Sequence, residues 1–184
     1  MKIKAGCIFI AIYVLASVGC CCLYAQQTIK SHTLSLTLSE IAVMDLEPAV
    51  SSIALDLSSP SNAGASIQTA TNNDSWINYS SCLAPSSPSR NISVQLTGTL
   101  PLGVELQLGI SSASGIGNGV WGTSVGAVTL SGVTTTIISG IGGCYTGNGS
   151  NNGHQLSYSV VINNYAALEG AIYGPFLVTY TISN

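Results

Sequence analysis

The chain has 184 residues, of which 46% are hydrophobic and only 6% are charged, and its formal net charge is −3. Ordinary domains carry about a quarter charged residues, so this surface must be built largely from Ser, Thr, Asn, Gln and Gly. With only four Lys and Arg residues there is no basic patch, which excludes binding to nucleic acid and attraction to anionic lipid. The regularly spaced apolar residues exclude disorder.

The N-terminus has the features of an export signal, expected to form the signal helix. Two lysines precede an uncharged apolar run that reaches Ala25. We expect cleavage after residues 1–25, which leaves residues 26–184 as a single domain. The domain is then secreted, or held at the cell surface of a bacterium, after passing through the periplasm. Two alternatives stay open: residues 17–20 resemble a lipoprotein cleavage box, and the apolar run approaches the ~20 residues that span a bilayer.

Alternating apolar and polar residues predict short β-strands along the rest of the chain. The alternation begins with Leu34, Leu36 and Leu38, which are separated by Ser and Thr. It resumes at residues 41–46 and stops at Pro48, because proline has no backbone donor and restricts the residue before it. The further predicted strands cover residues 53–57, a short stretch around 67, and residues 76–83, 92–96, 104–110, 120–130, 134–138, 156–162 and 176–182.

Turns rich in Gly, Ser, Asn and Pro separate these strands at a spacing of roughly 8–15 residues. No segment after the signal has a helical apolar stripe, and we expect at most one helical turn, at residues 166–168. We therefore predict an all-β protein, an antiparallel immunoglobulin-like sandwich of about nine or ten strands.

Cys82 and Cys144 are the two cysteines that remain once the signal is removed. An even number of cysteines in an exported chain predicts a disulfide between them. Closing a loop of about 60 residues would stabilise the fold by roughly 4 kcal/mol. The alternative is a pair of unrelated, partly buried thiols.

Groups that could carry catalysis are sparse. Nucleophilic catalysis needs a base beside Ser or Cys, and the candidate base His154 has no nucleophile motif around it. Asp74 lies among amides but supplies one carboxylate, too few for a calcium cage. The Gly-rich segments lack the lysine and the helix of a phosphate-binding loop. We expect no enzymatic activity, no cofactor and no metal; a secreted hydrolase that uses two of the scattered acids is the least favoured alternative.

Aromatic side chains provide a second functional hypothesis. Trp76, Trp121 and Tyr145 are candidate sugar contacts, since an exposed aromatic ring stacks on the apolar face of a sugar. The alternative is that these rings belong to the core or pack on a sheet face.

Several stretches carry a resemblance to known proteins: IAVMDLEP at 41–48, WINYSS at 76–81, SGIGGCYTGNGSNNGHQLSYS at 139–159 and VTYTIS at 178–183. They resemble a group of short exported bacterial proteins without a known activity. More distantly, the chain resembles fimbrial (pilin-type) subunits. That resemblance implies an incomplete immunoglobulin-like sandwich, which an N-terminal strand of the next subunit completes. Residues 33–38 are the candidate strand.

These observations together favour an exported, non-enzymatic structural or adhesive surface protein. Its expected partners are copies of itself or other surface subunits; a carbohydrate-binding module with glycan ligands is the alternative. The face formed by Leu34, Leu36 and Leu38 must be buried somewhere. We expect this strand to insert into its own sandwich, because little slack separates it from residues 41–46 and because Ser183 replaces the penultimate tyrosine of fimbrial subunits. Donation to a neighbouring copy is the alternative.

Overall fold

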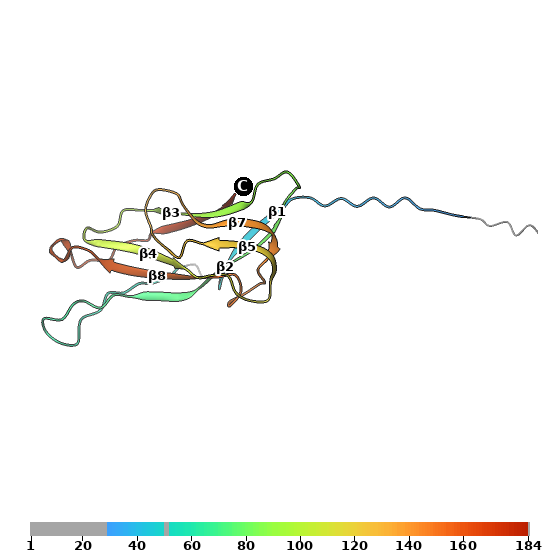
Figure 1. Ribbon diagram of the computed structural model, residues 1–184. Coiled ribbons are helices and arrows are strands. Elements are labelled where there is room, and N and C mark those ends of the chain that lie inside the picture. Colours follow the sequence, from blue (N-terminus) through green and yellow to red (C-terminus); the bar gives the residue numbers. More distant parts are fainter. Residues whose placement is uncertain (1–28, 50–51, 184) are drawn as a thin grey trace, which may run out of the picture. The chain divides into compact units, whose positions relative to one another are not determined.

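The computed structural model describes residues 29–49 and 52–183, so the signal expected at residues 1–25 lies outside the described residues (Figure 1). The chain divides into two units, Met1–Thr37 and Leu38–Asn184. In the first unit, residues 29–37 are an extended segment without helix or strand. The second unit contains all the strands that the structure describes.

The second unit is all-β and antiparallel, as predicted. Nine strands join in one sheet with the order β6-β4-β8-β2-β7-β3-β9, while β1 pairs with β2 and β5 pairs with β7. The only helical element among the described residues is a short 3-10 turn, η1. The elements are β1 (Ile41–Glu47), β2 (Thr71–Cys82), β3 (Arg90–Thr97), β4 (Val104–Ile110), β5 (Asn118–Ser124), β6 (Ala127–Thr129), β7 (Thr135–Tyr145), β8 (His154–Ile162), η1 (Tyr165–Ala167) and β9 (Leu177–Ser183).

One short junction connects two groups of strands within this sheet. Strands β2 and β7 pair only at Ser80 and Ser81. Just beyond, the N–H of Thr146 donates to the carbonyl of Tyr79 and the N–H of Tyr79 donates to Thr146 Oγ1, both at 3.0 Å. The junction separates a first group, β6-β4-β8-β2-β1, from a second group, β5-β7-β3-β9.

A single hydrophobic core takes side chains from both groups. Ile77 and Leu108 of the first group and Ile92 and Ile141 of the second are fully buried. Buried and less buried residues alternate along β3 and β8, as expected for strands with one face inward. Each fully buried aliphatic side chain stabilises the fold by about 1.5–3 kcal/mol, so this core is the main stabilising element.

Most predicted strands are confirmed, but several differ. The short strand expected around residue 67 is not formed, and only an isolated bridge joins Gln68 to Ser58. Residues 53–57 form no strand, although Ile53 and Leu55 pack against the core. Apolar and polar side chains alternate in residues 53–57 because one side of this segment faces the core. An extended segment can bury one side in this way without hydrogen bonding to a neighbouring strand. Strand β2 begins at Thr71, five residues before the predicted strand 76–83, and its pairing with β8 shifts register between Asn72 and Ser75. The predicted strand 120–130 is divided into β5 and β6 around Gly126, whose φ is +89°.

Candidate strand-binding site

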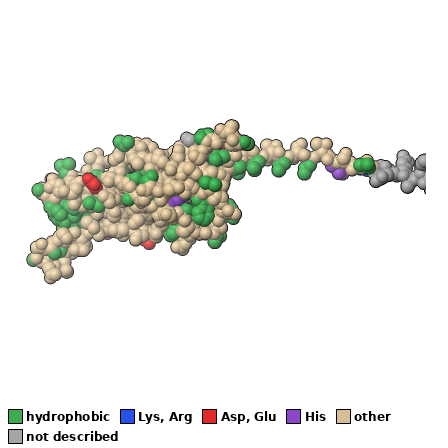
Figure 2. Space-filling model, in the orientation of Figure 1, with side chains coloured by type: hydrophobic (Ala, Val, Ile, Leu, Met, Phe, Trp, Pro, Cys, Tyr) green, Lys and Arg blue, Asp and Glu red, His purple; other side chains and the backbone are tan. Residues whose placement is uncertain are grey.

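The apolar N-terminal segment has no strand or helix of its own at residues 29–40. Leu34, Leu36 and Leu38 are 94%, 91% and 76% exposed, and none of them lies in a strand. Hydrophobic side chains project along the extended segment in Figure 2. The insertion of this segment into its own sandwich, and its donation to a neighbouring copy, both stay predictions.

The second unit contains two sheet edges that are open to each other. Among the described strands, β1 pairs only with β2, and β9 pairs only with β3. A hollow of about 410 Å³ lies between these two edges. Its walls are Met44, Asp45 and Leu46 on β1, and Leu177, Val178, Thr179 and Tyr180 on β9.

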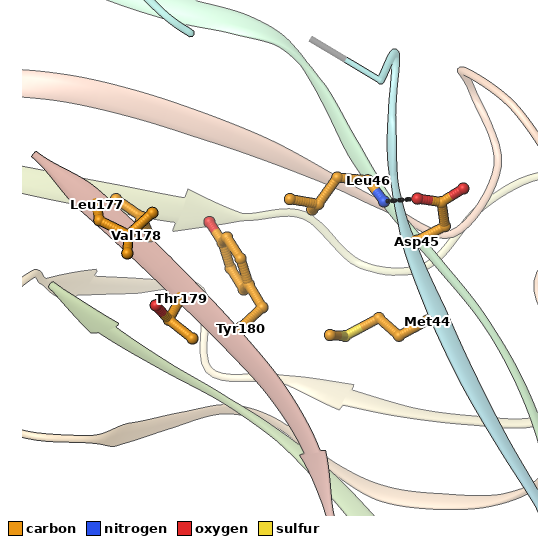
Figure 3. Close-up of a pocket in the computed structure, with 7 residues that line it drawn as sticks. All are labelled: Met44, Asp45, Leu46, Leu177, Val178, Thr179 and Tyr180. Carbon is orange, nitrogen blue, oxygen red and sulfur yellow. Dashed lines mark hydrogen bonds between the residues drawn. The ribbon is translucent and has the colours of Figure 1, made fainter. Parts of the chain in front are cut away.

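The inner side of this hollow is apolar and its outer side is polar. Met44 and Leu46 point across the gap toward Tyr180, whereas Asp45 lies on the other side of β1 (Figure 3). Met44, Leu46 and Val178 are partly buried and pack against the core. The carboxylate of Asp45 accepts the N–H of Leu46 at 2.8 Å. A third strand placed here would meet apolar side chains inward and solvent outward.

Tyr180 supplies a neutral polar group at the inner side of the hollow. Its hydroxyl lies 2.7 Å from the hydroxyl of Tyr158, so one of the two donates to the other. Burial raises the pKa of Tyr180 far above its usual value, and the neighbouring Tyr158 raises it further. Burial also raises the pKa of Tyr158. Both phenols therefore stay protonated at neutral pH, and no charge develops at this position.

The chain is anchored immediately before β1. Glu40 Oε1 accepts the N–H of Ala84 at 2.8 Å, and Arg90 Nη2 lies 3.9 Å from the same oxygen. The hydrogen bond from Ala84 is the main cause that lowers the pKa of Glu40, with smaller contributions from Ser87 and Arg90. Residues up to Leu38 precede this anchor.

His154 is a buried structural residue, not a polar turn residue at the surface. It is fully buried, its Nδ1 lies 2.8 Å from the carbonyl of Ser111, and its Nε2 lies 2.9 Å from the hydroxyl of Tyr79. That hydroxyl also donates to the carbonyl of Trp121. Burial is the main cause that lowers the pKa of His154. Its partners are a phenol and a carbonyl, which provide neither a nucleophile nor a carboxylate that would orient a catalytic base.

The predicted disulfide between Cys82 and Cys144 is not formed, and both cysteines are free. Cys144 pairs with Ser81, one position before Cys82 on β2. Neighbouring residues on a strand point to opposite faces, so this register directs the two side chains to opposite sides of the sheet. Cys144 packs against the core, and burial raises its pKa.

The three candidate sugar contacts do not form one aromatic surface. Trp76 precedes the core residue Ile77 and therefore lies on the outer face of β2, and Tyr145, 51% exposed, lies opposite Ser80 on that face. Trp121 pairs with Ile141 on β7 and is partly buried, so it is not an exposed platform beside the other two rings. Its Nε1 donates to the carbonyl of Tyr145 at 3.0 Å.

The described residues offer neither a metal-binding cluster nor a membrane-spanning helix. Within residues 29–49 and 52–183, no three His, Cys, Asp or Glu side chains gather closely enough to hold a metal ion. In the same part of the chain, no helix has the length and hydropathy needed to cross a membrane.

No protein-family model matches the chain, and no curated protein or solved structure matches it.

Proposed function

We propose that the protein is an exported, non-enzymatic structural subunit of a bacterial surface assembly, in which residues 33–38 of one copy complete the sheet of the next. The observation that carries this proposal is the presence, in one chain, of an exposed strand-like row of leucines and of an open apolar hollow between β1 and β9. Both features would promote aggregation of a protein that functions as a monomer, because exposed apolar strands and open sheet edges pair with other chains.

The donated segment and the hollow match in pattern and length. Leu34, Leu36 and Leu38 share one face of an extended strand, so all three would enter the gap, while Ser35 and Thr37 would face solvent. The three leucines span about 13 Å at ~3.3 Å per residue, close to the length of the four β9 residues that line the hollow. Burying three leucines is worth roughly 5–9 kcal/mol before the cost of association is subtracted.

The proposal includes a two-layer, immunoglobulin-like sandwich. The two groups of strands would form its layers, and the space between β1 and β9 would be the position of the missing strand. Support comes from the core, to which both groups contribute buried side chains, and from the short junction at Ser80 and Ser81. The export route rests on the signal features of residues 1–25, and the lack of enzymatic activity rests on the scarcity of catalytic groups.

A complementation experiment tests the proposal. A donor-defective variant carries Leu34→Ser, Leu36→Ser and Leu38→Ser, and an acceptor-defective variant carries Met44→Lys, which places a charge in the hollow. We expect the unmodified protein to form detergent-resistant ladders and each variant alone to remain monomeric. A mixture should stop at a one-to-one dimer, because only one donor strand and one acceptor hollow remain functional.

A matched control changes the opposite face of the same segment, with Ser35→Thr and Thr37→Ser, and should still form ladders. Light scattering after size-exclusion chromatography measures the masses. An unmodified protein that stays monomeric at high concentration would contradict the proposal, as would a donor-defective variant that polymerises normally.

A further inference from the structure

A second hollow lies on the outer face of the sheet where β1, β2 and β7 meet, and of its lining only Asp45 also lines the gap between β1 and β9. Its volume is about 470 Å³, within the ~300–1,000 Å³ range of ligand sites. Its lining includes Asp45, Asn78, Ser80, Ile116, Tyr145 and Asn148.

The strand register explains why these side chains meet. Asp45 on β1 pairs with Asn78 on β2, and Ser80 on β2 pairs with Tyr145 on β7. Paired residues on neighbouring strands present their side chains on the same face. A carboxylate, an amide, a hydroxyl and a phenol ring therefore form two adjacent rows beside the short junction of β2 and β7.

Apolar surface is available beside these polar groups. Tyr145 is 51% exposed and Ile116 is 81% exposed, although both line the hollow. The aromatic ring of Tyr145 thus offers a face to a ligand instead of serving the core. An aromatic ring with hydrogen-bonding groups around it suits a ligand that has both an apolar face and hydroxyls.

Asn78 adds a polar group that the protein does not satisfy by itself. The residue is only 4% exposed, and its Nδ2 donates to the carbonyl of Asn152 at 2.6 Å. Because this bond fixes the nitrogen toward the 147–153 loop, the amide oxygen is the remaining acceptor. That oxygen is buried and has no hydrogen-bond donor among the described residues, at an expected cost of about 1–3 kcal/mol.

The charge of the lining restricts the ligand. Asp45 is the one charged residue in the lining, and one of its carboxylate oxygens accepts the N–H of Leu46. With the Asp45 carboxylate as an acceptor and no cation in the lining, the hollow favours a ligand that donates hydrogen bonds and carries no negative charge. Phosphates, sulfates and acidic sugars would be repelled.

We propose that this hollow binds a neutral carbohydrate. One sugar ring lies against Tyr145 and its hydroxyls donate to Asp45. The polar side chains of Ser80 and Asn148 in the lining fix the orientation of the sugar. This activity goes beyond assembly, because the binding groups lie on the outer face, whereas the donated strand would fill the gap at the edges of β1 and β9. Each copy in an assembly would present its own sugar site.

The test is a glycan array probed with the full-length protein after removal of the signal. The array carries neutral hexose and N-acetylhexosamine oligosaccharides together with sialylated and sulfated ones. We expect saturable binding to neutral glycans, and calorimetry with the best neutral oligosaccharide should show at least a tenfold loss of affinity for Tyr145→Ala and for Asp45→Asn. The matched control is Tyr165→Ala, which removes an equally exposed tyrosine outside the hollow and should bind normally.

Melting curves establish that each variant is folded. Binding to no neutral glycan, a preference for acidic glycans, or full affinity in Tyr145→Ala would each overturn the inference. Tyr145→Ala should leave ladder formation unchanged. Glycan binding therefore tests the sugar site, and ladder formation tests the assembly, independently of each other.

Discussion

Replacing Tyr79 with phenylalanine tests the buried network beside the junction of β2 and β7. The Tyr79 hydroxyl donates to the carbonyl of Trp121 and lies 2.9 Å from His154 Nε2. The Ser111 carbonyl, 2.8 Å from His154 Nδ1, takes the proton of the neutral ring, so Nε2 is an acceptor. Tyr79→Phe therefore removes the hydroxyl proton that serves the buried His154 Nε2 and the partly buried Trp121 carbonyl.

A buried acceptor left without a donor costs about 1–3 kcal/mol, and we expect a loss of about 2–3 kcal/mol in the free energy of unfolding. In a domain of this size, that lowers the Tm by about 4–12 °C. Urea unfolding followed by circular dichroism measures the loss, and an unchanged m-value establishes that the denatured state is unaltered. Tyr165→Phe, at a 52% exposed position, is the control and should change stability by less than about 0.5 kcal/mol. A loss in Tyr79→Phe no larger than in this control would refute the reasoning.

Three further predictions concern acid stability, backbone space and thiol chemistry. Burial lowers the pKa of His154, so the unfolded chain binds more protons below about pH 6.5; stability should fall as the pH drops from there, and His154→Gln should flatten this part of the pH profile measured by urea unfolding. Gly153→Ala should lose about 3 kcal/mol or more in the same assay, because φ is +75° and a Cβ would clash with the carbonyl oxygen of Ile77, whereas Gly132→Ala, with no atom within 4 Å, should be nearly neutral. Protein lacking residues 1–25, denatured without a reducing agent, should show two alkylatable thiols by mass spectrometry, at Cys82 and Cys144; a mass without any alkylation would contradict the observed register.

The sequence alone was sufficient to predict the strands that turn one regular apolar face toward the core. In the central parts of β4 and β8, every second residue is buried, and this regularity comes directly from the alternation of Leu106, Leu108 and Ile110 or of Leu156, Tyr158 and Val160. Periodicity reports which side of a strand faces the core. It does not report whether the backbone has a partner, so residues 53–57 and 34–38 gave the same pattern as true strands while they pair with no neighbouring strand.

The candidate sites depended on register, which is a non-local property. Cys82 and Cys144 suggested a disulfide by their number alone, but a difference of one position on β2 separates them onto opposite faces. The pairing of Asp45 with Asn78 likewise depends on how β1 aligns with β2. The run IAVMDL predicted a strand with Met44 and Leu46 on one face, yet no local signal indicated that its outer edge stays open.

Hydrogen exchange at the two open edges provides the most direct test of the central claim, that a strand from another copy fills the hollow between β1 and β9. A peptide of residues 30–40 is added to the donor-defective variant, whose own leucines are replaced by serine and whose hollow is intact. We expect backbone amides on both sides of the hollow, in residues 44–46 and 177–180, to exchange more slowly as the peptide saturates, because both edges gain hydrogen-bond partners. Unchanged exchange at both edges, or equal protection by a peptide with serine at positions 34, 36 and 38, would contradict the account.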